Sequence, residues 1–306
     1  MNRPFDILVA GEINPDLILS GDVNPEFGQV EKLVESVSLS IGSSSAIFAC
    51  GAARLGLKVA VIGMCGDDLF GRFMLEAMQS RSVDVSNVIR IPGGRTGVSV
   101  ILARGGDRAI LTYPGLIAAL KASDISDQLL RQTRHLHVAG YFLQTALQPG
   151  LPALFKRAHA LSVTTSLDTN WDPAEKWGGI LELLPLTDVF LPNAAEAMAI
   201  TGLETIDLAA EELAQHAGIA AAKLGAEGAL GVQGKLKSRT SAIAVTVVDT
   251  VGAGDSFDAG FLFGYLNHWN LEKSLKLGAA CGALSTQAAG GTTAQPSLEE
   301  AMRHVG

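Results

Sequence analysis

The sequence predicts an α/β fold in which helices cover both faces of a mainly parallel sheet. Short apolar runs, typical of buried strands, alternate with helical patterns along nearly the whole chain of 306 residues. Hydrophobic residues make up 48% of the sequence and charged residues 18%, which supplies a sizeable core and argues against disorder. Since no linker, repeat or low-complexity tract divides the chain, we expect one domain over residues 1–306.

The first half of the chain begins with a strand pattern at residues 5–10. A helix pattern at 44–55 follows, with Ser43 or Ser44 as its N-cap and Gly56 just beyond its end. The further elements expected here are strands at 59–63 and 135–139, a helix at 70–81, and a hairpin of 99–103 and 109–113 joined by residues 104–108.

The second half continues the alternation. A helix at 150–162 has Pro152 in its first turn, where the missing N–H of proline costs nothing. The other elements expected are strands at 163–167, 188–191, 219–223 and 228–232, and helices at 194–201, 209–217, 255–268 and 271–289. Ligands of such sheets bind beyond the C-terminal ends of the strands, so we expect the site there.

Two stretches, 12–38 and 92–113, fit the helix alternation poorly. We expect them to form a small accessory sheet that acts as a lid. An exposed edge of such a sheet seeks a partner, so a homodimer formed through the lid is expected.

Composition excludes several kinds of partner. The net charge is −8 and no run of Lys or Arg stands out, so neither nucleic acid nor an anionic membrane is expected as a partner. The chain has no apolar stretch long enough for a membrane span, and its N-terminal run resembles a strand more than a signal peptide. The three cysteines form no CxxC pair, which predicts free thiols and a cytoplasmic protein.

Residues 249–262 read DTVGAGDSFDAGFL and place small residues directly before a helical pattern. A helix N-terminus carries unsatisfied N–H groups, and Gly252, Ala253 and Gly254 would let an anion approach them closely. An acid at Asp255 is either a helix cap or a base that takes the proton of an attacking hydroxyl during phosphoryl transfer.

This fourteen-residue stretch resembles the C-terminal signature of the PfkB family of carbohydrate kinases. Further motifs resemble that family over nearly the whole chain: Gly11-Glu12 with Asp16, residues 41–46 running on to 54–56, Gly63 with 66–68 and Gly71, 168–170, 191–196, and 224–228. The resemblance implies a ribokinase-like three-layer α/β/α sandwich with a small β-sheet lid. It also implies an ATP-dependent kinase of a sugar or polyol, with residues 252–254 as the hole for the γ-phosphate and Asp255 as the base.

The resemblance implies roles for further residues. The substrate residues would be Asp16, Gly42, Ser43 and Asn170, and the nucleotide residues Asn193, Glu196, Lys223, Gly225 and Gly228. Asn193 and Glu196 also share one helix face by their spacing, and their oxygens suit Mg²⁺ bound through waters; the plainer alternative is a cap and a surface glutamate. Asp249 and the carbonyl of Val251 would hold a monovalent cation such as K⁺, as in many family members.

Two positions depart from the family pattern. Ile47 stands where an asparagine usually contacts substrate, and Asp172 stands where an arginine often follows the D-x-N segment. With acids at Asp16, Asp168 and Asp172, the pocket is expected to favour a neutral polyol over a sugar phosphate, because carboxylates accept hydrogen bonds from hydroxyls and repel phosphate.

Two other functions stay open. A nucleoside kinase would need aromatic stacking, which a content of 6% aromatic residues disfavours. A non-catalytic sugar or nucleotide sensor on the same fold is disfavoured by the intact loop at 252–255. His135 and His137, on one face of a strand, are expected to be structural, as are the tryptophans, except that Trp177 would wall the ligand site.

Overall fold

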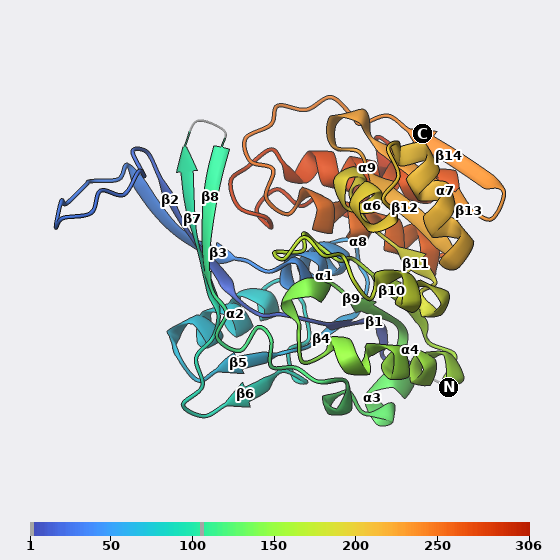
Figure 1. The fold of residues 1–306 in the computed structure, drawn as a ribbon, viewed down its shortest axis with the longest axis horizontal. Coiled ribbons are helices and arrows are strands. Elements are labelled where there is room, and N and C mark those ends of the chain that lie inside the picture. The colour runs from blue at the N-terminus through green and yellow to red at the C-terminus, as the bar shows by residue number, and fades with distance from the viewer. Residues whose placement is uncertain (1–2, 105–106) are drawn as a thin grey trace.

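The computed structural model describes residues 3–104 and 107–306, so residues 105 and 106 of the expected hairpin turn lie outside it. Eight strands form the central sheet in the order β14-β13-β12-β11-β10-β9-β1-β4 (Figure 1). Their bounds are β1 Phe5–Ala10, β4 Val59–Ile62, β9 Thr133–Val138, β10 Thr164–Leu167, β11 Val189–Phe190, β12 Ile219–Lys223, β13 Ala229–Gln233 and β14 Leu236–Thr240. The sheet is parallel from β12 to β4, and β13 and β14 pair antiparallel, so the predicted architecture is confirmed.

Helices cover both faces of this sheet, as the alternating pattern predicts. Ile7 and Val9 of β1 belong to one apolar core, with α1, α2, α8 and α9; Leu8 and Ala10 belong to the other, with α3, α4, α6 and α7. The helices are α1 Ser44–Arg54, α2 Leu69–Gln79, α3 Asp127–Arg131, α4 Leu151–Ala160, α5 Ile180–Leu183, α6 Ala194–Thr201, α7 Ile206–His216, α8 Ala253–Leu266, α9 Leu271–Ser285 and α10 Leu298–Met302. Successive strand residues point to opposite faces, which is why both cores draw on the same strand.

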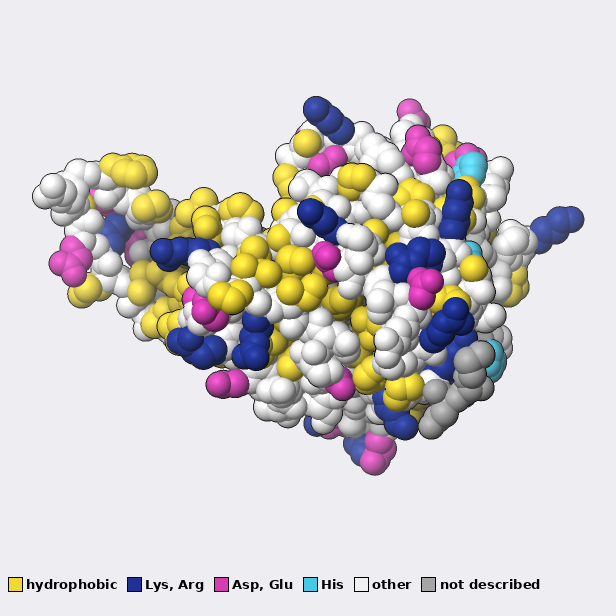
Figure 2. Space-filling model, turned by 90° about the horizontal axis from the view of Figure 1, so that it is seen from below, with side chains coloured by type: hydrophobic (Ala, Val, Ile, Leu, Met, Phe, Trp, Pro, Cys, Tyr) yellow, Lys and Arg dark blue, Asp and Glu magenta, His cyan; other side chains and the backbone are white. Residues whose placement is uncertain are grey.

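A second sheet of four strands projects from the body (Figure 1). Its order is β3-β2-β7-β8, with β2 Pro15–Ser20, β3 Ser36–Ile41, β7 Val98–Arg104 and β8 Asp107–Tyr113. These strands come from the two stretches expected to form an accessory sheet. Hydrophobic side chains lie along this projecting part of the molecule (Figure 2). Phe27 and Leu33, in the connection between β2 and β3, are 97% and 85% exposed. A separate pair, β5 Met64–Gly66 and β6 Ile89–Ile91, was not expected from the sequence.

The expected elements differ from the observed ones mainly at their ends. The expected helix at 271–289 ends at Ser285, and the expected helix at 255–268 begins at Ala253. Edge strand β14 was missed because its sequence LKSRT is polar and largely exposed, so it lacks the apolar run of the buried strands.

Several plainer expectations hold. Cys50, Cys65 and Cys281 are free and buried. The Ser166 hydroxyl lies 2.7 Å from both His135 Nε2 and His137 Nδ1, and burial lowers the pKa of each histidine to about 3, so both are neutral parts of the core. In the described part of the chain, no helix is long and apolar enough to cross a membrane.

Candidate active site

The motif residues meet at the C-terminal edge of the parallel strands. Asp168 follows β10, Lys223 ends β12, and Asn193 follows β11 and pairs its backbone with Lys223. Asp255, on α8, brings its carboxylate to the same edge, where its oxygens lie within 4.8 Å of those of Asp168. Strand ends are the position that the fold class predicts for a ligand.

The first turn of α8 has the form of an anion site. Gly252 is the N-cap in the left-handed region, at φ 72°, and no side chain caps the helix. Among the hydrogen bonds of the described chain, none is donated by the N–H groups of Gly254 or Asp255. These groups carry the partial positive charge of the helix N-terminus. The alternative that Asp255 is a helix cap is therefore wrong, since Asp255 lies in the first turn and not at the cap position.

Asp255 lies in surroundings that make it a strong proton acceptor. The residue is 9% exposed, and burial, with the nearby charge of Asp168, raises its pKa well above the usual value. The positive charge of Lys223 and a hydrogen bond from Ser44 act in the opposite direction. Ser44 in turn accepts a hydrogen bond from Asn170 Nδ2, so the predicted base and a predicted substrate residue meet through one hydroxyl.

Lys223 is engaged by carboxylates in this structure. Its Nζ lies 3.0 Å from Asp168 Oδ2 and 3.1 Å from Asp258 Oδ2. Burial alone would lower the pKa of Lys223, but the charges of Asp168, Asp258 and Glu196 outweigh burial and raise it. The lysine is therefore charged at all physiological pH values.

Asn193 and Glu196 form a capping box at the start of α6. The Asn193 side chain accepts the N–H of Glu196 at 2.9 Å, and Glu196 Oε2 accepts the N–H of Asn193 at 2.8 Å. Glu196 is only 4% exposed, so it is not the surface glutamate of the plainer alternative. Burial and the charge of Asp168 raise its pKa to about 7. Glu196 Oε1 also accepts a hydrogen bond from Asn193 Nδ2 at 2.6 Å, so the cap of the plainer alternative is confirmed, while a role of the pair in holding the waters of Mg²⁺ stays a prediction.

The glycines after β12 shape the turn that leads away from Lys223. Gly225 and Gly228 have φ values of 58° and 96°, in the region that side chains disfavour. The carbonyl of Thr240 lies where a side chain on Gly228 would begin, so only glycine fits there.

The predicted substrate residues lie where β2 and α1 begin. Asp16 is buried, and desolvation, together with the charge of Asp249 and against that of Arg108, raises its pKa to about 7. The Asp16 carboxylate lies in the space that a side chain on Gly42 would take. Ser43 caps α1: its hydroxyl accepts the N–H of Ala46 at 3.0 Å and donates to the carbonyl of Glu12.

The structure places both departures from the family pattern. Ile47 lies 3% exposed on α1, and its side chain fills the space beside Gly252 and Gly291, next to the anion loop, so the loss of a polar substrate contact there stays a prediction. Asp172 accepts the N–H groups of Ala174, Lys176 and Trp177 at 2.8 to 2.9 Å, so it closes its own loop.

The electrostatic expectation for the pocket changes accordingly. Of the three acids expected to line it, Asp168 is paired with Lys223 and Asp172 with its own loop, which leaves Asp16. Arg108 lies close enough to lower the pKa of Asp16. Arg108 thus adds positive charge beside Asp16, and the preference for a neutral polyol over a sugar phosphate stays a prediction.

A cavity of about 870 Å³ lies between the second sheet and the segment before α8. Its walls include Ile18 and Ile101 of the second sheet, and residues 247–251. Asp249, in that wall, accepts the N–H of Val251 at 3.0 Å and the N–H of Gly290 at 2.9 Å, and Arg108 lies 3.9 Å from it. The predicted cation residues are thus next to one another beside this cavity.

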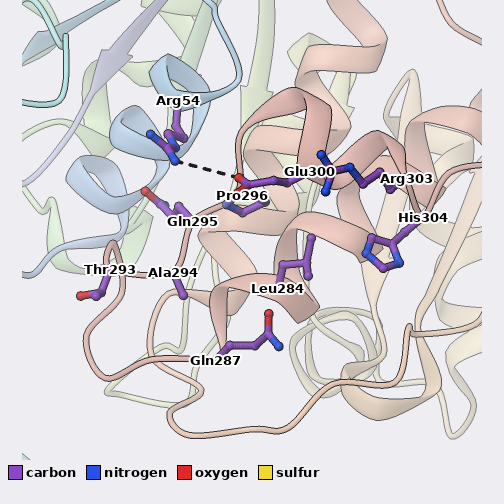
Figure 3. Close-up of a pocket in the computed structure, with 10 residues that line it drawn as sticks. All are labelled: Arg54, Leu284, Gln287, Thr293, Ala294, Gln295, Pro296, Glu300, Arg303 and His304. Carbon is purple, nitrogen blue, oxygen red and sulfur yellow. Dashed lines mark ion pairs between the residues drawn. The ribbon is translucent and has the colours of Figure 1, made fainter.

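A hollow of about 360 Å³ elsewhere on the surface holds none of the predicted site residues (Figure 3). Arg54 and Glu300 lie 3.9 Å apart across it. The side chain of Gln295, in the wall of this hollow, points into the protein. Its Nε2 donates to the carbonyl of Ile47 at 2.9 Å and to Ser256 Oγ of α8 at 3.1 Å. It supports the anion loop from behind.

Sequence reasoning missed two residues of the site, Ser44 and Asp258. Ser44 was noted only as a candidate helix cap, yet it bonds Asp255. Asp258 lies in the stretch that resembles the signature but was given no role; its spacing of three from Asp255 places both on one helix face, which was a usable signal.

Comparison with known proteins agrees with this geometry. The profile of the pfkB family carbohydrate kinases matches residues 5–298. The 2-dehydro-3-deoxygluconokinase of Bacillus subtilis is 32% identical, with 90% of this chain and 89% of the relative covered. A solved adenosine kinase from Sinorhizobium meliloti is 27% identical at a TM-score of 0.87, covering 99% and 100% of the two chains. Ribokinase from Arabidopsis thaliana has the same fold, at 23% identity, a TM-score of 0.86 and coverage of 100% and 99%. The chain belongs to the pfkB family of carbohydrate kinases.

Proposed function

We propose that this protein transfers the γ-phosphate of ATP to a hydroxyl of a sugar or sugar-like polyol. One observation carries the proposal: a buried carboxylate, Asp255, stands in the first turn of a helix whose N–H groups at Gly254 and Asp255 have no partner in the described chain. Family membership supports the reaction class.

In this reaction Asp255 accepts the proton of the acceptor hydroxyl as that oxygen bonds to the γ-phosphorus. The bond from this phosphorus to the bridging oxygen breaks, and ADP leaves. The N–H groups in the first turn of α8, above all those of Gly254 and Asp255, stabilise the charge on the transferred group, because preorganised donors cost no reorganisation; the N–H of Ala253 donates to the carbonyl of Thr250 at 3.3 Å. Mg²⁺ would neutralise phosphate charge, and Asn193 and Glu196 would orient its waters.

The nucleotide would lie along the ends of β11 and β12. Gly225 and Gly228 turn the chain there without side chains, which lets a ligand approach the backbone. We propose that Asp249 and the carbonyl of Val251 hold a monovalent cation, supported by their place directly before the anion loop. Activity in KCl compared with LiCl tests this: equal rates would contradict it.

The second sheet would close over the acceptor. Water is also a hydroxyl, so an open site would hydrolyse ATP, and closure excludes it. Asp16 at the start of β2, with Gly42, Ser43 and Asn170, would contact the acceptor. We also place the enzyme in the cytoplasm, because its cysteines are free.

A substrate panel tests the proposal. Purified protein with MgATP is assayed for ADP release with ribose, 2-dehydro-3-deoxygluconate, 5-dehydro-2-deoxygluconate and adenosine, and product phosphorylation is confirmed by mass. We expect turnover on a sugar. ATP hydrolysis without phosphorylated product, or ligand binding without turnover, would favour the sensor instead.

A nucleoside acceptor remains the second candidate. The adenosine kinase above matches over nearly the whole chain, and Trp171, next to Asn170, is 50% exposed. Trp171 packs edge-to-face on Trp177, which packs likewise on Phe142, so aromatic side chains do lie near the predicted acceptor residues. Phosphorylation of adenosine at a higher kcat/KM than any sugar would establish this candidate.

Asp16 predicts a pH dependence of acceptor binding. Its pKa is raised to about 7, mainly by burial, so it is largely protonated below that pH and ionised above it. Because a carboxylate accepts hydroxyl donors better than a carboxylic acid does, KM for the acceptor should fall as pH rises through about 7. In Asp16→Asn this change should vanish; a KM that still falls would assign the effect to another group.

Exposed apolar side chains of the second sheet support the expected homodimer. Val37 and Leu111 are each 63% exposed, and Tyr113 is 51% exposed, on strands of the second sheet. Apolar surface of this kind usually marks an interface. We expect sedimentation to give a dimer and Val37→Lys with Leu111→Lys to give a monomer. A wild-type monomer at micromolar concentration would contradict the prediction.

A further inference from the structure

A buried lysine joins separate elements directly behind the proposed base. Lys223 Nζ, at the end of β12, lies 3.0 Å from Asp168 Oδ2 after β10, and 3.2 and 3.1 Å from the carboxylate oxygens of Asp258 in α8. The three side chains are 12%, 4% and 1% exposed, so solvent does not screen the contacts. Lys223 thus ties the catalytic helix to the edge of the sheet.

The lysine also lies against the anion loop. A Cβ placed on Gly254 would lie 3.5 Å from Lys223 Cδ and 3.6 Å from its Nζ. Oxygens of Asp168, Asp255 and Asp258 lie within 4.8 Å of one another. The ammonium group is therefore beside three carboxylates, and two of them hold it in place.

These contacts give a further role to Lys223, which the family resemblance places among the nucleotide residues. Its Nζ lies at hydrogen-bonding distance from Asp168 and Asp258. Breaking one of these contacts would leave a buried charge uncompensated, which is costly. The ammonium group is therefore fixed in its place.

We infer that Lys223 is a positioning residue for Asp255: it is the fixed counter-charge that lets the base remain ionised, and Asp168 and Asp258 hold it there. The inference rests on the proposed function, because it gives Asp255 the role of base. Like charges that share a buried site disfavour ionisation of one member. Without the lysine, a proton would be retained among the three carboxylates, and a protonated Asp255 cannot accept the acceptor's proton.

The groups around Asp255 set the direction of this effect. The charged and polar groups that face it are Asp168 after β10, Lys223 of β12, Glu12 after β1, Ser44 of α1 and Asp258 of α8. Lys223 is the cation among them, and the acids all oppose ionisation of Asp255. Removing the lysine and removing an acid should therefore act in opposite directions.

The test compares Lys223→Met, Asp258→Asn and the double variant in the pH dependence of kcat/KM. Lys223→Met should move the acid limb upward by about one pH unit or more, and so lower kcat near neutrality by a matching factor of about ten or more. Asp258→Asn should move the limb downward, and the double variant should recover part of the loss. KM for ATP should change little. The matched control is Lys237→Met, an exposed lysine paired with Asp207 and Glu211, which should behave as wild type.

Three results would overturn the inference. One is a raised KM for ATP in Lys223→Met with an unmoved acid limb, which would make the lysine a nucleotide contact. Another is a loss of kcat that Asp258→Asn does not relieve. The third result applies if Lys223→Met does not fold. In that case, an acid limb of Asp258→Asn that stays in place or moves upward would overturn the inference. Failure of the proposed function is distinguishable, because it appears as turnover retained in Asp255→Asn whatever Lys223 does.

Discussion

Asp255→Asn is expected to lower kcat by about 10²- to 10⁴-fold, the usual contribution of a general base. Asparagine keeps the shape and the hydrogen bond to Ser44 but cannot take a proton. The measurement is ATP-dependent phosphorylation of the best acceptor of the panel, with KM determined for both substrates. Because the lost interaction belongs to the transition state, kcat should fall with little change in either KM.

The same substitution should not destabilise the protein. The pKa of Asp255 in the folded protein is raised, mainly by burial, so its ionised form opposes folding at pH values above the pKa of the unfolded chain. The neutral amide removes that penalty, and the melting temperature at pH 8 should stay equal or rise. Asp207→Asn, on the surface, is the matched control and should retain activity. A wild-type kcat in Asp255→Asn would end the assignment of the base.

Gly252→Ala is the second change with a large expected effect. Gly252 has a φ of 72°, and a Cβ there would lie 2.8 Å from Gly291 Cα and 2.8 Å from Ile47 Cγ2. The left-handed conformation alone costs about 1–3 kcal/mol for a residue with a side chain, and the contact with backbone forces the loop to move. Since the loop positions the phosphate donors, we expect kcat to fall about 10²-fold, together with a lower melting temperature.

Gly234→Ala is the control that separates the effect of backbone strain from the effect of displacing the anion loop. Gly234 also has a positive φ, of 56°, but nothing lies within 4 Å of a Cβ placed there. This variant should lose stability alone and keep its activity. If Gly252→Ala lost stability to the same extent and kept its kcat, the loop would not be an anion hole.

Most of the fold could be predicted because its elements carry local signals. The apolar run of β1 and the capping serine of α1 are examples, and the structure has both where they were expected. Strand β14 could not be found this way, because an edge strand with polar side chains is held by its pairing with β13, which is a tertiary contact. The same holds for β5 and β6, three residues each.

The sequence allowed the backbone features of the site to be predicted, but it was a poorer guide to the directions in which side chains point. The anion loop at Gly252 follows from helix-terminus chemistry, which depends on neighbours in sequence, whereas the choice of base over cap for Asp255 came from the family resemblance. The direction of Asp172 depends on a loop that folds back on it, and the partners of Lys223 come from β10 and α8. No spacing in the sequence states which distant acid a buried lysine will meet.

The place of α8 in the chain has a consequence for synthesis. Phe257 and Phe261 of α8 belong to the same core as Phe48 of α1, so that core cannot close until residues 253–266 have left the ribosome. The base therefore arrives on one of the last helices to join that core. A growing chain therefore has no complete site for phosphoryl transfer until the core on that side can close.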